Sequence, residues 1–160
     1  MPNIAVNDDL GSWMALQPSM APGLVAFSNA VYGQSQLPRR VQEIARMRIA
    51  LANECSVCQG ARWAEGSNEG LDEAFYAQVL DWRQASIYSE REKLAAEYAE
   101  RFASDHVGLR ADSDFWQRYR AQFSEAEIVD LALCCALWLG AGRTMRVLDV
   151  GQSCALTLGG

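Results

Sequence analysis

Two cysteines separated by two residues, Cys55 and Cys58, are the residues of this chain whose type and spacing best suit chemistry. Such a pair can close a disulfide, and a helix that begins there would stabilise a thiolate, because a helix N-terminus favours negative charge. A thiolate attacks peroxides and disulfides, and a partner thiol then resolves the sulfenic acid or mixed disulfide. The spacing therefore predicts dithiol chemistry.

Three other interpretations of the pair stay open. Half of a zinc site would need further ligands, and the chain has one histidine and no second C-x-x-C motif. Two cysteines buried among small apolar residues would serve packing alone. A regulatory disulfide without turnover is the third.

The other cysteines favour simpler explanations. Cys134 and Cys135 stand in an apolar segment that predicts core packing, and Cys154 lies in a glycine-rich tail. An odd number of cysteines in a chain of 160 residues argues against a disulfide scaffold, since a chain of this length can bury a core of its own.

Composition excludes several classes of partner. The formal net charge is −6 and no run of Lys or Arg could follow a phosphate backbone or a membrane surface. The first residues lack the basic start and apolar core of a signal peptide. The uncharged part of the most apolar stretch, 131–142, is shorter than the roughly 20 residues of a spanning helix. We expect a cytoplasmic protein with no nucleic-acid or membrane partner.

Helical periodicity dominates the chain and strand signals are nearly absent, which predicts an all-α single domain. The residues divide into an irregular N-terminal lead-in (1–22), a helical domain (23–150) and a flexible C-terminal tail (151–160). About six or seven helices are expected, over residues 23–32, 38–53, 55–66, 71–82, 89–102, a short one from 112, and 124–148.

Local signals mark several of these helices. Ser89 with Glu92 and Ser124 with Glu127 have the spacing of capping boxes. In the helix over 38–53, the apolar residues predict a buried face. Arg39, Arg40 and Arg46 are predicted to lie on the more solvent-exposed face. The last helix is apolar on nearly all sides over 131–139, which favours burial against another subunit. We expect a homo-oligomer.

The run from Glu43 to Ala50, followed by the segment from Asn53 to Cys58, resembles the core of the carboxymuconolactone decarboxylase family. It is most similar to the AhpD-like alkylhydroperoxidase branch, whose signature is a glutamate, eleven residues, then C-x-x-C-x-x-x-H. Glu43, Cys55 and Cys58 match that signature. The likeness covers roughly residues 20–150, so it implies the AhpD-like helical fold.

The resemblance also implies roles, and it breaks at one of them. Cys58 would attack peroxide, Cys55 would resolve the product, and Glu43 would assist a histidine that relays the proton. This chain has Arg62 at the histidine position, and a guanidinium is no base. Arg62 could instead stabilise a thiolate, pair with Glu43, bind a substrate carboxylate, or be solvated. His106, in a predicted loop, could be a surrogate base or purely structural.

The function implied is that of a thiol-dependent, peroxiredoxin-type oxidoreductase that reduces a peroxide or exchanges disulfides. It needs no metal or organic cofactor, and a thioredoxin-like or dihydrolipoyl partner would restore the dithiol. One alternative is a decarboxylase-like lyase or isomerase acting on a small carboxylate, although that branch does not rely on a cysteine pair. Another is a non-enzymatic oligomer whose thiols sense oxidation.

Overall fold

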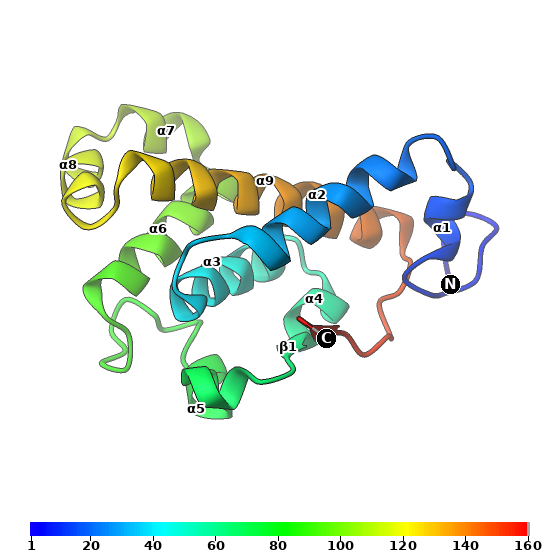
Figure 1. Cartoon of the computed structure of the whole chain (residues 1–160), viewed down its shortest axis with the longest axis horizontal. Coiled ribbons are helices and arrows are strands. Elements are labelled where there is room, and N and C mark those ends of the chain that lie inside the picture. The colour runs from blue at the N-terminus through cyan, green and yellow to red at the C-terminus, as the bar shows by residue number, and fades with distance from the viewer. Residues whose placement is uncertain (160) are drawn as a thin grey trace.

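The computed structural model describes residues 1–159 of the chain. These residues form an all-α domain, as the sequence predicts, together with one very small parallel sheet (Figure 1). The α-helices are α1 (Ser12–Ala15), α2 (Ala21–Gln34), α3 (Arg39–Ala52), α4 (Ser56–Gly60), α5 (Glu73–Ala77), α6 (Glu90–Ser104), α7 (His106–Ala111), α8 (Ser113–Gln122) and α9 (Glu125–Leu148). The strands are β1 (Arg62–Trp63) and β2 (Thr157–Leu158), and a 3-10 turn, η1, covers Gly66–Glu69.

Helix α3 lies at the centre of the core. It packs chiefly against α6 and α9, and its side chains are buried along most of its length. Ile44, Ala45 and Ile49 have no exposed surface. Burial of such side chains contributes about 1.5–3 kcal/mol each for the larger ones, so this helix fixes the position of whatever follows it in the chain.

The two predicted capping boxes are confirmed. At the start of α6 and again at the start of α9, the serine oxygen accepts from an amide three residues on, and the glutamate there bonds back to the serine amide. Each box satisfies amides that the helix itself leaves free. The N-terminal starts of the two longest helices, α6 and α9, are therefore set by local sequence.

Helix α9 carries the most apolar sequence of the chain. Its 24 residues, with a mean hydropathy of 1.4 over the best 18-residue window, are long and apolar enough to cross a membrane by length and composition alone. However, α9 packs against α2, α3 and α6, as a core helix of a globular protein does. Val129, Leu133 and Val147 are exposed on it, and the expected subunit contact there stays a prediction.

Two further helices appear where the sequence predicted none. α1 interrupts the lead-in expected over 1–22, and α7 replaces the loop expected around His106. α7 forms because the Asp105 side chain accepts a hydrogen bond from the amide of Gly108 and so caps the first turn. α5 is shorter than the helix predicted over 71–82.

The helix predicted over 55–66 is also wrong in its extent. α4 ends at Gly60, because Ala61 is extended (ψ 139°) and the next two residues form β1. β1 pairs in parallel with β2, so the tail predicted to be flexible over 151–160 has a strand in it that is hydrogen-bonded to the chain after α4.

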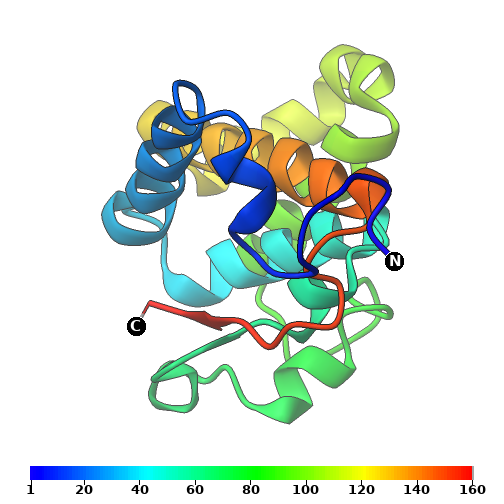
Figure 2. The same cartoon turned by 90° about the vertical axis from the view of Figure 1, so that its right-hand side faces the viewer.

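Both terminal segments lie beside the C-terminal end of α9, where Figure 2 shows the N-terminal segment crossing it. The Asn3 amide donates to the Leu148 carbonyl, and the Asp8 carboxylate accepts from the amide of Gly151 and the hydroxyl of Ser153. The N-terminal segment and the tail are thus held to one another, next to α4.

Candidate redox site

Cys55 and Cys58 are joined in a disulfide, with 5.2 Å between their Cα atoms. α3 ends at Ala52, and Glu54 then adopts a left-handed backbone (φ 51°) that turns the chain into α4. Cys55 is the N-cap residue of α4 and Cys58 lies within its single turn. The predicted proximity of the two sulfurs at a helix start is therefore confirmed.

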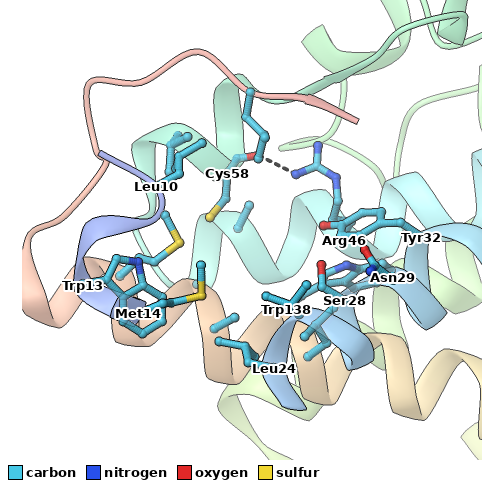
Figure 3. Close-up of a pocket in the computed structure, with 18 residues that line it drawn as sticks. Leu10, Trp13, Met14, Leu24, Ser28, Asn29, Tyr32, Arg46, Cys58 and Trp138 are labelled. Atoms are coloured by element: carbon cyan, nitrogen blue, oxygen red, sulfur yellow. Dashed lines mark hydrogen bonds between the residues drawn. The ribbon is translucent and has the colours of Figure 1, made fainter. Parts of the chain in front are cut away.

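The two cysteines differ in their access to a ligand. Cys55 has no exposed surface, whereas Cys58 is partly exposed and lines a cavity of about 250 Å³. Figure 3 shows the Cys58 sulfur directed into that cavity. A small molecule in the cavity can reach Cys58, and Cys55 lies behind it in the protein.

The cavity is mostly apolar and is built from both ends of the chain. Helices α2 and α9 form two walls, α1 and the segment before it form a third, and α4 carries Cys58. Its apolar lining residues are Leu10, Trp13, Met14, Leu24, Val25, Ala50, Val57, Leu137, Trp138, Ala141, Gly142, Met145 and Leu156. Polar side chains come from Ser28, Asn29, Tyr32 and Arg46. Such a cavity suits a small apolar molecule with a polar end.

Glu43 and Arg46 form a buried ion pair beside the site. The Arg46 guanidinium donates to both carboxylate oxygens of Glu43, at 2.8 Å from Nε and 2.6 Å from Nη2. The indole N–H of Trp63 and the hydroxyl of Tyr76 donate to the same carboxylate, each at 2.9 Å. Glu43 therefore has two partners on each oxygen and is placed to hold its neighbours in position.

Arg46 connects this pair to the cysteine helix. Its guanidinium donates to the backbone carbonyls of Cys58, at 2.5 Å, and Ala61, at 3.2 Å. Burial disfavours its charge, but the Glu43 carboxylate outweighs that effect and raises the pKa of Arg46 above its ordinary value. Burial, together with Glu43, also raises the pKa of Tyr76. Arg46 thus stays charged and fixes both ends of the Cys58–Ala61 segment.

The sequence placed Arg46 on the wetter side of its helix, and that prediction is wrong. Arg46 is only 3% exposed. The signal available was its spacing, since a residue three positions after Glu43 on a helix lies beside it. Tyr32 and Trp138 were also missed as cavity residues, because they come from α2 and α9, far from the motif in sequence.

Arg62 lies outside the helix of Cys58, because α4 ends before it. Its guanidinium donates to Glu73 at 3.2 Å and to the carbonyls of Gln59 and Ala61, and it lies over the Tyr76 ring at 3.8 Å. It does not pair with Glu43, whose ion-pair partner is Arg46. The contacts of Arg62 are those of a side chain that caps the end of α4.

Arg62→Ala is therefore expected to leave the pH profile of Cys58 alkylation by iodoacetamide unchanged in the reduced protein. The charge removed already interacts with Glu73 and two carbonyls. The matched variant Arg46→Met should alter the alkylation rate, because the Cys58 carbonyl then loses its buried partner. A shift of the profile towards higher pH in Arg62→Ala alone would instead make Arg62 the group that stabilises the thiolate.

The remaining predicted residues lie away from the cavity. His106 is exposed at the start of α7, which packs against α6, and it is not among the cavity residues. Cys134 and Cys135 are buried in α9, and burial raises the pKa of Cys134 to about 12. Both are thus poor nucleophiles. Cys154 is partly exposed, with its sulfur 3.8 Å from the Asp8 carbonyl oxygen.

The tail contributes directly to the placement of α4. The side-chain oxygen of Gln152 accepts from the amide of Ser56 at 3.0 Å, which satisfies one of the free amides at the start of that helix. On the far side of α4, the amides of Arg62 and Ala64 donate to the carbonyls of Leu156 and Leu158. The C-terminal tail, which the sequence predicts to be flexible, thus supports the cysteine pair on both sides of α4.

Gly142 leaves the space that the site requires between α9 and α4. A Cβ atom there would lie 2.8 Å from Nδ2 of Asn53 and 3.4 Å from Sγ of Cys58. Asn53 cannot move freely, because it donates to the carbonyls of Trp138 and Leu139 and accepts from Arg143. Gly142 is therefore required for close approach of α9 to the cysteine helix.

Gly142→Ala is expected to lower the free energy of unfolding by about 1–3 kcal/mol, the typical cost of an overpacked contact. Gly140→Ala, in the same helix, is the matched control, since a Cβ there meets no atom within 4 Å. It should stabilise α9 by roughly 0.5–1 kcal/mol. Urea unfolding of both variants checks this, and equal stabilities would contradict the close approach.

The fold and the site together define a class of protein, namely an all-helical protein whose C-x-x-C disulfide borders an apolar cavity. The sequence model of the carboxymuconolactone decarboxylase family matches residues 18–101, more than half of the chain. This chain belongs to the carboxymuconolactone decarboxylase family.

A solved structure shares the fold. It is a protein of unknown function from Agrobacterium tumefaciens, assigned provisionally to antioxidant defence as AhpD. The two structures agree with a TM-score of 0.73 at 19% sequence identity, over 89% of this chain and 96% of that one. The fold is therefore AhpD-like, as the sequence resemblance implied. No curated protein matches the sequence.

Proposed function

We propose that this protein is a thiol-dependent oxidoreductase that reduces organic hydroperoxides with the Cys55–Cys58 pair. The observation that carries the proposal is the direction of the Cys58 sulfur into an apolar cavity, with its disulfide partner fully buried behind it. Membership of the family and the AhpD-like fold support the same class of activity.

The cycle starts from the dithiol. The Cys58 thiolate attacks one oxygen of the hydroperoxide, the O–O bond breaks, and the released alkoxide takes up the proton that Cys58 has lost. Cys58 is then a sulfenic acid. The Cys55 thiol attacks its sulfur, water leaves, and the disulfide seen in this structure forms. An external dithiol, thioredoxin-like or dihydrolipoyl, reduces that disulfide.

Glu43 and Arg46 act in this cycle as positioning residues. The Glu43 carboxylate is fully engaged by Arg46, Trp63 and Tyr76, so its part is to hold Arg46 against the Cys58 and Ala61 carbonyls. Cys58 then keeps its place at the cavity when the disulfide opens. The protein works in the cytoplasm, where reductants of this class restore dithiols.

Titration of free thiols tests the proposal. The reduced protein is mixed with one equivalent of cumene hydroperoxide, and two thiols should disappear rapidly in wild type. Cys134→Ala is the matched control, because that thiol is buried and does not react, so the variant should also lose two thiols. A protein that keeps its thiols under these conditions but converts a lactone acid would be a lyase. One that does neither would be a binding protein, and both results contradict the proposal. A protein that loses two thiols once but consumes no further hydroperoxide in the presence of dithiothreitol would be an oxidation sensor, which also contradicts the proposal.

A further inference from the structure

Two thioethers share the cavity with the cysteine pair. Met14 lines the cavity from α1 and Met145 lines it from α9, and both side chains are partly exposed. In Figure 3, the sulfurs of Met14 and Cys58 are both directed into the cavity. A hydroperoxide held in this space therefore meets a methionine sulfur as well as the cysteine sulfur.

The state of the cysteine pair decides which of these sulfurs reacts. In the disulfide form, Cys58 is bonded to Cys55 and offers no thiolate to the cavity. A thioether needs no ionisation to react, and hydroperoxides convert it to a sulfoxide. When the external dithiol is scarce, the disulfide persists, and the thioether is then the nucleophilic sulfur that a hydroperoxide meets.

The element that carries Met14 is weakly held. None of residues 1–30 is buried, and α1 is only four residues long. Hydrogen bonds to the tail and to the end of α9 fix the chain before it, up to Asp8. In the described part of the chain, the backbone of α1 bonds only to its own neighbours in sequence. α1 therefore stays on the cavity through the packing of Leu10, Trp13 and Met14.

We propose that an organic hydroperoxide held in the cavity oxidises Met14 to the sulfoxide, and that this oxidation releases α1 from the cavity wall. The thioether sulfur attacks the hydroxyl oxygen of the hydroperoxide and the O–O bond breaks. The hydroxyl proton passes to the alkoxide, which leaves as the alcohol, so the sulfur is oxidised by two electrons and the peroxide is reduced.

The release follows from the polarity of the product. A sulfoxide is polar, and it is less stable than a thioether against an apolar wall. Because α1 depends on that packing, its equilibrium shifts towards the open form. The cavity then opens when hydroperoxide exceeds the reductant. This step rests on the proposed function for its ligand, an organic hydroperoxide, but not for the reactivity of Cys58.

The chemical step is tested on the disulfide form, in which Cys58 cannot compete. The protein is treated with cumene hydroperoxide or with hydrogen peroxide, and methionine sulfoxide is located by mass spectrometry. Met20, which is 71% exposed and lies outside the cavity, is the internal reference. Cumene hydroperoxide should oxidise Met14 at least about 10-fold faster than Met20, since a ligand held beside a group reacts at a raised effective concentration.

Two controls show whether binding in the cavity causes this preference. Hydrogen peroxide is not retained by an apolar cavity, so it should oxidise Met20 first. Cumene has the same ring and no peroxide, so an excess of it should slow the oxidation of Met14 and leave that of Met20 unchanged. Equal rates at the two methionines with cumene hydroperoxide, or no effect of cumene, would overturn the proposed oxidation.

Hydrogen exchange of the amides of residues 10–16, followed by mass spectrometry, tests the release of α1. Treatment with cumene hydroperoxide should accelerate this exchange about 10-fold in wild type, and methionine sulfoxide reductase should reverse the change. Met14→Leu keeps the size of the side chain without its sulfur and should show no acceleration. Met20→Leu is the matched control and should behave as wild type. An unchanged wild type, or equal acceleration in Met14→Leu, would overturn the release.

The results for Met14 and for Cys58 are independent of each other. A protein whose Met14 is oxidised in this way, but whose dithiol ignores cumene hydroperoxide, would contradict the proposed function alone. Rapid loss of both thiols in the reduced protein, with Met14 left intact in the disulfide form, would contradict the role of Met14 alone.

Discussion

Glu43→Gln is expected to lower the free energy of unfolding by about 3–5 kcal/mol, because it leaves the Arg46 charge buried without a counter-charge. Both side chains are almost wholly buried, at 0% and 3% exposure, so water cannot replace the lost carboxylate. The same change weakens the bonds that Trp63 and Tyr76 donate to Glu43. Urea unfolding followed by circular dichroism measures the loss.

Two further variants make this result specific. Glu73→Gln removes the carboxylate of a side chain that is 82% exposed and paired with Arg62. The free energy of unfolding of this variant should not differ measurably from that of wild type. Adding Arg46→Met to Glu43→Gln should recover part of the loss, since it removes the uncompensated charge. If Glu43→Gln were as stable as Glu73→Gln, the buried pair would not support α4 as described.

Cys58→Ser is expected to abolish turnover of organic hydroperoxides, with a loss of at least about 1,000-fold, because a serine hydroxyl does not ionise as a thiol does. Consumption of cumene hydroperoxide in the presence of dithiothreitol measures it. Cys55→Ser should keep a first, rapid reaction of Cys58 and lose efficient turnover, since no neighbouring thiol then resolves the sulfenic acid.

The order of the two effects follows from burial. Cys58 lines the cavity and Cys55 is enclosed, so a ligand meets Cys58 first. Cys134→Ser is the matched control for loss of a thiol in the core, and it should retain turnover. If the Cys58→Ser protein still consumed hydroperoxide at the wild-type rate, the reacting group would not be Cys58 and would not lie in this cavity.

Local sequence predicts the long helices and the cysteine pair well. The capping boxes at Ser89 and Ser124 work through residues three positions apart, so they are visible without a structure. The proximity of Cys55 and Cys58 follows in the same way from their spacing. The end of α4 does not, because it depends on β2, which begins nearly 100 residues later at Thr157.

The cavity could not be predicted for the same reason. Tyr32, Trp138 and Leu156 come from α2, α9 and the tail, and they meet Cys58 only when the domain is packed. Arg46 was misplaced because the hydrophobic pattern assigns arginine to the solvent side, whereas Glu43 compensates its charge inside the core.

The reactivity of one sulfur can be measured directly. Reduced Cys55→Ser protein is treated with one equivalent of cumene hydroperoxide and then with dimedone, which labels sulfenic acids, and the labelled residue is located by mass spectrometry. We predict that the label is on Cys58. Label on Cys154, or none on any cysteine, would contradict the assignment of Cys58 as the residue that receives the peroxide oxygen.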